Sequence, residues 1–110
     1  MDQTDLLVHD LGLSRTLRGF RCLVVALKLV REDIALLTAV TTRLYPMVAD
    51  HLDTSPSRVE RNLRTAVEIC WQYGNRELLA QIIRCPHGGR PSVSEFIDQL
   101  AVYLQTHETM

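Results

Sequence analysis

Apolar residues recur along most of this chain at spacings of three and four, the period of an α-helix with one buried face. Leu6, Leu7 and Leu11 predict a short first helix with Gly12 just beyond its end. Ser14 is expected to cap a second helix, whose inward residues are Leu17, Phe20, Leu23, Val24, Leu27 and Val30. No stretch alternates convincingly with period two, so the sequence predicts an all-α fold.

A strong break separates two further predicted helices in the middle of the chain. The apolar positions from Ile34 to Leu52 predict a third helix, which Pro46 should bend because proline lacks a backbone donor. Ser55 and Pro56 have the residue types of an N-cap and a first helical position. The fourth helix then runs from about residue 56 to 73, with Trp71 at the margin of its buried stripe of Val59, Leu63, Ala66, Val67 and Cys70.

The remaining sequence predicts two more helices, for six in all within a single domain spanning residues 1–110. A short helix over residues 76–83 is followed by a loop over residues 84–91. Ser92 or Ser94 should cap the last helix, whose inward residues are Phe96, Ile97, Leu100, Ala101 and Leu104.

Composition narrows the class of protein. The 110 residues are 46% apolar and 23% charged, as in an average soluble domain, with a net charge of −1. No apolar run could span a membrane, and the acidic N-terminus is not a secretory signal. The three cysteines lie far apart and give no disulfide framework, so we expect a reduced, cytoplasmic protein.

Basic residues gather in the middle of the chain. Residues 14–90 hold all twelve Lys and Arg against seven acids, about +5, and eleven of the twelve are Arg. Arginine suits bidentate contacts with phosphates and guanine edges, although ordinary surface arginine is an equally available reading of composition alone.

Catalytic or metal chemistry has little support. Cys85, Pro86 and His87 suggest a metal site with His51 or His9, but structural zinc usually needs four ligands in local pairs. The glycines at 88 and 89 lack the preceding strand and following lysine of a phosphate loop. We therefore predict no enzyme, no cofactor, no metal and no catalytic residues, with Cys22 and Cys70 as small core residues.

Residues 38–73 have the layout of a helix-turn-helix, whose second helix enters the DNA major groove. Arg58 and Arg61 are three apart, hence neighbours on one face, and each could donate twice to guanine. Glu60 could accept from a cytosine amino group. The alternative is an ordinary solvated face in which Glu60 and Arg64 form an i,i+4 ion pair.

Several motifs along the whole chain resemble one family. Ser57-Arg58-Val59-Glu60-Arg61, Ala66-Val67-Glu68, Trp71 and Gly74-Asn75 resemble its recognition helix. Six further segments resemble the family's sequence pattern and occur in the same order: His9-Asp10-Leu11-Gly12, Arg18-Gly19-Phe20, Asp33-Ile34, Leu36-Leu37, Leu44-Tyr45-Pro46 and Ser94-Glu95-Phe96-Ile97. The family is the C-terminal DNA-binding (effector) domain of stage 0 sporulation protein A, the sporulation response regulator of Firmicutes.

The resemblance implies six helices and specific roles for the fourth. Arg58, Glu60 and Arg61 would contact bases of a short promoter box in double-stranded DNA. Ser57 and Arg64 would lie at the phosphates, with Thr65 beside them where the family often has a basic residue. The resemblance further implies a contact of the region 76–83 with the sigma subunit of RNA polymerase, and head-to-tail homodimers on tandem boxes through the last helix.

One part of the family's architecture has no counterpart here. Residues 1–13 cannot form its N-terminal phosphoacceptor receiver domain, so we expect an isolated effector domain or a free-standing relative without that switch. The predicted function is a sequence-specific DNA-binding transcriptional regulator. The alternative is a protein-interaction module that pairs with the full-length regulator or with sigma factor and does not read DNA. Thr65 and the near-neutral charge favour this alternative, whereas the intact sequence from Ser57 to Arg61 favours DNA reading.

Overall fold

The computed structural model describes residues 2–85 and 88–108. This part of the chain forms six α-helices and contains no strand, so the predicted all-α class is confirmed. The helices are α1 (Gln3–Asp10), α2 (Arg18–Glu32), α3 (Tyr45–Leu52), α4 (Pro56–Tyr73), α5 (Arg76–Ile82) and α6 (Val93–Glu108).

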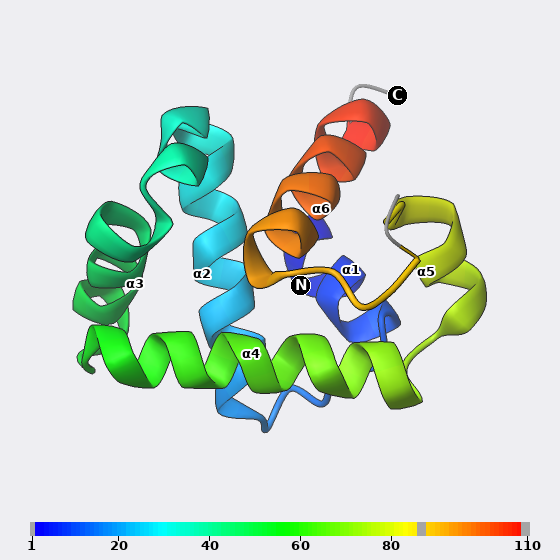
Figure 1. Cartoon of the computed structure of the whole chain (residues 1–110), viewed down its shortest axis with the longest axis horizontal. Helices are drawn as coiled ribbons and strands as arrows, with labels where there is room; N and C mark the ends of the chain where they lie inside the picture. The colour runs from blue at the N-terminus through cyan, green and yellow to red at the C-terminus, as the bar shows by residue number, and fades with distance from the viewer. Residues whose placement is uncertain (1, 86–87, 109–110) are drawn as a thin grey trace.

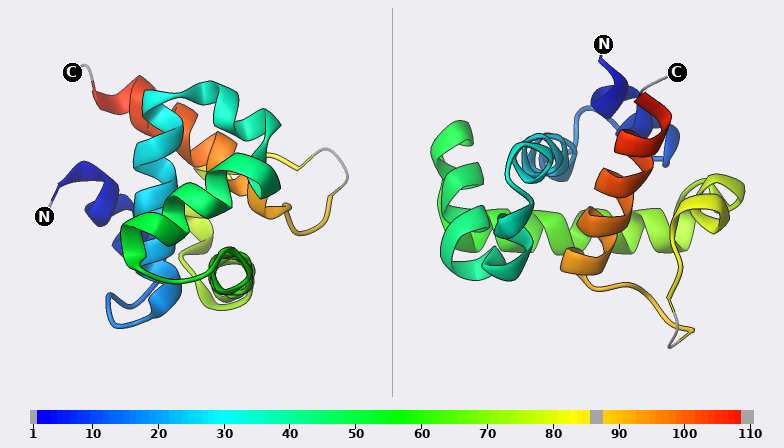
Figure 2. Two further views of the ribbon diagram at one scale, coloured as in Figure 1. Left: turned by 90° about the vertical axis from the view of Figure 1, so that its left-hand side faces the viewer. Right: turned by 90° about the horizontal axis from the view of Figure 1, so that it is seen from above.

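The helices are arranged around α2 and α4. In Figure 1, α4 lies along one side of the molecule, and α2 and α6 rise from it. α3 packs against α4 and α2, whereas α1 packs against α2 and α6 (Figure 2). Contacts of α2 with four other α-helices explain why its apolar positions are almost continuous.

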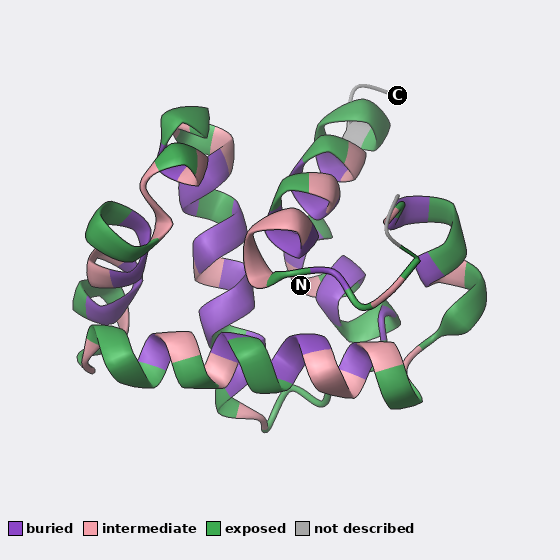
Figure 3. Ribbon diagram, viewed as in Figure 1, coloured by how far each residue is buried: buried purple, intermediate pink, exposed green. Residues whose placement is uncertain are grey.

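The core consists of the residues expected from the helical period. All five stripe residues of α4 are buried, as are the five predicted inward residues of α6 (Figure 3). In α2 the predicted inward residues are buried apart from Leu17, which lies partly exposed just before the helix. Two apolar residues of the predicted helical pattern, Leu6 and Ile34, are exposed, with 45% and 62% of their surfaces accessible to solvent.

The start of α2 corrects the prediction that Ser14 caps this helix. The helix begins at Arg18, and its N-cap position, Leu17, has no side-chain cap. Ser14 Oγ instead accepts a hydrogen bond from the Thr16 amide at 3.2 Å. A serine hydroxyl can stabilise a local turn as readily as a helix start, so the residue type alone did not place the boundary.

The predicted single helix over residues 34–52 is also wrong. The segment forms a 3₁₀ helix (Ile34–Thr38), a π-helical turn (Val40–Leu44) and only then α3, in which Pro46 lies in the first turn. Ala39, between the first two, has a non-helical backbone. Pro46 therefore does not bend a helix interior; it occupies a position where its missing donor costs nothing.

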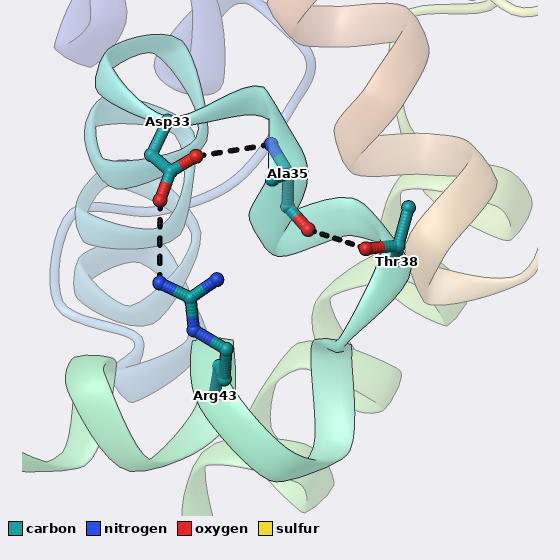
Figure 4. Close-up of polar contacts among 4 residues, drawn as sticks. All are labelled: Asp33, Ala35, Thr38 and Arg43. Atoms are coloured by element: carbon teal, nitrogen blue, oxygen red, sulfur yellow. Dashed lines mark hydrogen bonds and ion pairs between the residues drawn. The ribbon is translucent and has the colours of Figure 1, made fainter.

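Asp33 holds this irregular segment in place. One of its oxygens accepts from the Ala35 amide at 3.1 Å, and the other pairs with Arg43 at 3.3 Å (Figure 4). Thr38 Oγ1 donates to the carbonyl oxygen of Ala35 at 2.7 Å. These contacts fold the 3₁₀ turn back on the π turn and so fix where α3 begins.

Glycine allows α1 to end tightly against α4. Gly12 has φ +106°, and a Cβ there would lie 2.8 Å from the Cα of Gly74. Asn75 reinforces the junction, because its amide donates to the carbonyl oxygen of Leu11 at 3.1 Å. Its Oδ1 also accepts from the Leu78 amide and caps α5. The predicted glycine after the first helix is confirmed, and the short fifth helix ends one residue earlier than predicted.

The last helix starts with a reciprocal cap. Ser92 Oγ accepts from the Glu95 amide at 3.1 Å, and Glu95 Oε1 accepts from the Ser92 amide at 2.9 Å. Of the two serines proposed as caps, the structure therefore selects Ser92.

Candidate nucleic-acid interface

The turn between α3 and α4 is short and well defined. α3 ends at Leu52, and its C-cap residue, Asp53, has left-handed backbone angles (φ 54°, ψ 52°). The Thr54 amide donates to the carbonyl oxygen of Ala49 at 3.0 Å. Ser55 Oγ accepts from the Arg58 amide at 3.3 Å, so the predicted N-cap is confirmed. Pro56 takes the first helical position. These features fix the direction in which α4 leaves the turn.

The outer face of α4 divides into two flanks. At 100° per residue, Arg61 lies near the middle of the face turned away from the buried stripe. Arg58 and Thr65 lie on the flank toward α2, with Asn62 below them. Ser57 lies on the other flank, and all but the half-buried Asn62 are exposed.

The second flank also carries Glu60 and Arg64, which form an ion pair with each other. Tyr45 of α3 lies close to this pair. Burial, and secondarily the Glu60 carboxylate, raises the pKa of its hydroxyl. Two of the predicted DNA contacts are therefore already engaged with each other in the free chain.

Arg58 and Arg61 are placed differently. Within the described residues, neither guanidinium pairs with a carboxylate, and both side chains line one open hollow of about 800 Å³ beside the turn. The structure thus brings Arg58 and Arg61 together. Glu60 and Arg64 lie apart from them on the other flank.

The same hollow contains two arginines that were not predicted as site residues. Arg18 and Arg21, in the first turn of α2, line it opposite Arg58 and Arg61. Their spacing of three equals that of Arg58 and Arg61, but the sequence does not reveal that α2 and α4 cross here. The signal for this crossing is Gly19, since a Cβ there would lie 2.7 Å from the carbonyl oxygen of Asn62.

The described residues contain no group of three or more His, Cys, Asp or Glu side chains that could hold a metal ion. Pro86 and His87 of the Cys-Pro-His sequence lie outside the described residues. Cys22 and Cys70 are buried in the core, as predicted, and burial raises the pKa of Cys70 to about 12. No described helix is long and apolar enough to cross a membrane.

Most of the chain matches a known protein family. A family described as "Sporulation initiation factor Spo0A C terminal" matches residues 4–104, which leaves only three residues before the match and six after it. The matched region includes α1 to α5, the turn before α4 and most of α6.

Proposed function

This chain belongs to the family of C-terminal domains of sporulation initiation factor Spo0A, the effector domain of a sporulation regulator, and we propose that it acts by reading double-stranded DNA. In this proposal α3 and α4 form a helix-turn-helix, and α4 enters the major groove. Arg58 and Arg61 would contact guanine edges, and Glu60 a cytosine amino group. The role is one of binding in the cytoplasm, without catalysis.

One observation carries the proposal: Arg58 and Arg61 lie together, exposed and without a carboxylate partner among the described residues, on the first turns of a helix with a fixed start. Recognition helices contact base edges with these first turns. A rigid start matters because an error of about 1 Å in helix position would misalign a bidentate contact.

The Glu60–Arg64 pair gives these two residues a specific expected behaviour. On binding, Arg64 would turn to a phosphate and leave Glu60 for a base. Breaking the exposed pair costs little, about 0.3–0.5 kcal/mol for an i,i+4 pair of this kind. The ion pair therefore does not prevent Arg64 from reaching a phosphate or Glu60 from reaching a base. Ser57 and Thr65 would add hydrogen bonds from their uncharged hydroxyl groups to the DNA backbone.

The proposal is tested by fluorescence anisotropy with duplexes that carry the promoter box of the family or a scrambled sequence of equal composition. We expect tighter binding to the box at every salt concentration. Equal, negligible binding to both duplexes at low salt would contradict the proposal.

That outcome would favour a second candidate function, pairing with a full-length regulator or with the sigma subunit of RNA polymerase. The observation that favours this alternative is the same Glu60–Arg64 pair, which occupies two of the six predicted contact residues. A pull-down with each purified partner would distinguish it from DNA reading.

A further inference from the structure

We propose that the hollow between the first turns of α2 and α4 is a seat for DNA backbone phosphates, held by Arg18 and Arg21. The hollow is called the arginine hollow below and is lined by Arg18, Arg21, Arg58 and Arg61, and also by Asp53 and Thr54 of the turn. This inference rests on the proposed function, because it names how the same helix is held at the groove.

Positive charge is concentrated in the arginine hollow. Four guanidinium groups line the arginine hollow against one carboxylate, that of Asp53, and none of the four forms an ion pair within the described part of the chain. Three basic side chains elsewhere do pair with carboxylates: Lys28 with Asp2 at 2.7 Å, Arg43 with Asp33 at 3.3 Å and Arg90 with Glu68 at 3.2 Å. Gathered, unpaired positive charge creates a local potential that attracts a polyanion.

Packing between α2 and α4 fixes where Arg18 and Arg21 lie. Gly19 lies between the two arginines of α2 in sequence, and its missing side chain lets the helix approach the backbone of α4 at Asn62. Asn62 Nδ2 also reaches Cys22 Sγ at 3.9 Å across the same contact. Arg18 and Arg21 are thus held at one flank of α4 by buried contacts, although their own side chains are exposed.

The shape of double-stranded DNA suits the position of the arginine hollow. The walls of a DNA major groove are its two phosphate backbones, so a helix lying in the groove has a backbone along each flank. The arginine hollow opens on the α2 flank of α4, next to Arg58. A guanidinium fork binds a phosphate through two parallel hydrogen bonds, so Arg18 and Arg21 suit this backbone while Arg58 and Arg61 face the bases.

Phosphate contacts and base contacts have different measurable signatures. Each neutralised phosphate adds about −0.9 to the slope of log K against log salt, on any duplex sequence. Base contacts instead set the ratio of affinities between the box and the scrambled duplex. The role of Arg18 and Arg21 can therefore be measured even on DNA that the protein does not recognise.

The experiment is a salt titration of wild type, Arg18→Gln, Arg21→Gln and the double variant on both duplexes. We expect each single change to make the slope shallower by about 1, and the double change by about 2, with the box-to-scrambled ratio unchanged. Arg18→Lys keeps the charge and should restore the slope. Arg76→Gln, an exposed arginine on α5 outside the hollow, is the matched control and should keep the wild-type slope.

If the double variant has the same slopes as wild type while wild type still prefers the box, this inference is overturned and the proposed function remains intact. A wild-type protein without box preference would instead remove the proposed function, and the slopes on scrambled DNA would still test the seat. Calorimetry with inorganic phosphate distinguishes a free-anion site. Phosphate binding lost in the double variant, with an unchanged slope on DNA, would overturn the assignment to the DNA backbone.

Discussion

Leu63 is completely buried at the centre of the α4 stripe, and its truncation tests which face of the helix is the inner one. We expect Leu63→Ala to lower the free energy of unfolding by about 2–5 kcal/mol, because it leaves a cavity that neighbours fill only in part. Leu6→Ala is the control, since Leu6 is 45% exposed and should change stability by much less. Urea denaturation measures both. A Leu63→Ala variant as stable as wild type would mean that the helix is rotated.

The three cysteines differ in their surroundings and should differ in reactivity. Burial raises the pKa of Cys70 to about 12 and also raises that of Cys22, so neither is a thiolate near pH 8. Cys85 is only half-buried, although burial and the Glu95 carboxylate raise its pKa as well. We expect iodoacetamide to modify Cys85 first in the native protein, and the other two only on unfolding. Peptide mass spectrometry locates the label, and rapid native labelling of Cys70 would contradict this packing.

At the scale of elements, the contact of α2 with α4 depends on one missing side chain. Gly19→Ala would place a Cβ 2.7 Å from the carbonyl oxygen of Asn62 and 3.0 Å from the Cβ of Ala66. We expect the variant to lose about 1–3 kcal/mol of stability, because the two helices must move apart. Thermal unfolding decides the sign. An increase in stability, as for an exposed helical glycine replaced by alanine, would show that the approach is not tight.

Helices with one continuous buried stripe were predictable from the sequence. α4 agrees with the prediction at both ends because Ser55 and Pro56 start it and Gly74 follows its last residue. The segment 34–52 was not predictable in this way. Its apolar residues keep a helical spacing, but Asp33 caps a 3₁₀ turn through the Ala35 amide and also pairs with Arg43 of the π turn, and the spacing of apolar residues reveals neither contact.

The candidate site was predictable only where it is local in sequence. Arg58 and Arg61 are neighbours because they lie three apart on one helix, so period alone places them together. Arg18 and Arg21 join them through the crossing of α2 and α4, and no local pattern carries that information. The spacing of Glu60 and Arg64 is compatible either with DNA contacts or with an i,i+4 ion pair, and the ion pair is present in the free chain.

At the scale of the whole molecule, the net charge of −1 conceals an uneven distribution, because four arginines without an ion-pair partner among the described residues gather at one hollow. A single copy that reads DNA through α4 would make few contacts with one box, so two copies should bind adjacent boxes more tightly than one. We expect cooperative binding to two boxes about one helical turn apart, through pairing of α6. Lengthening the spacing by about half a turn should remove the cooperativity. Independent binding at both spacings would contradict pairing.

The most direct measurement of whether α4 reads DNA compares wild type, Arg58→Ala and Arg61→Ala on the promoter box and on scrambled DNA, with Arg76→Ala as control. Each change on α4 should cost about 1–3 kcal/mol on the box, lower the box-to-scrambled ratio and leave the unfolding temperature unchanged. Arg76→Ala should alter none of the three. If both α4 variants kept the box-to-scrambled affinity ratio of wild type, that result would contradict base reading by this helix.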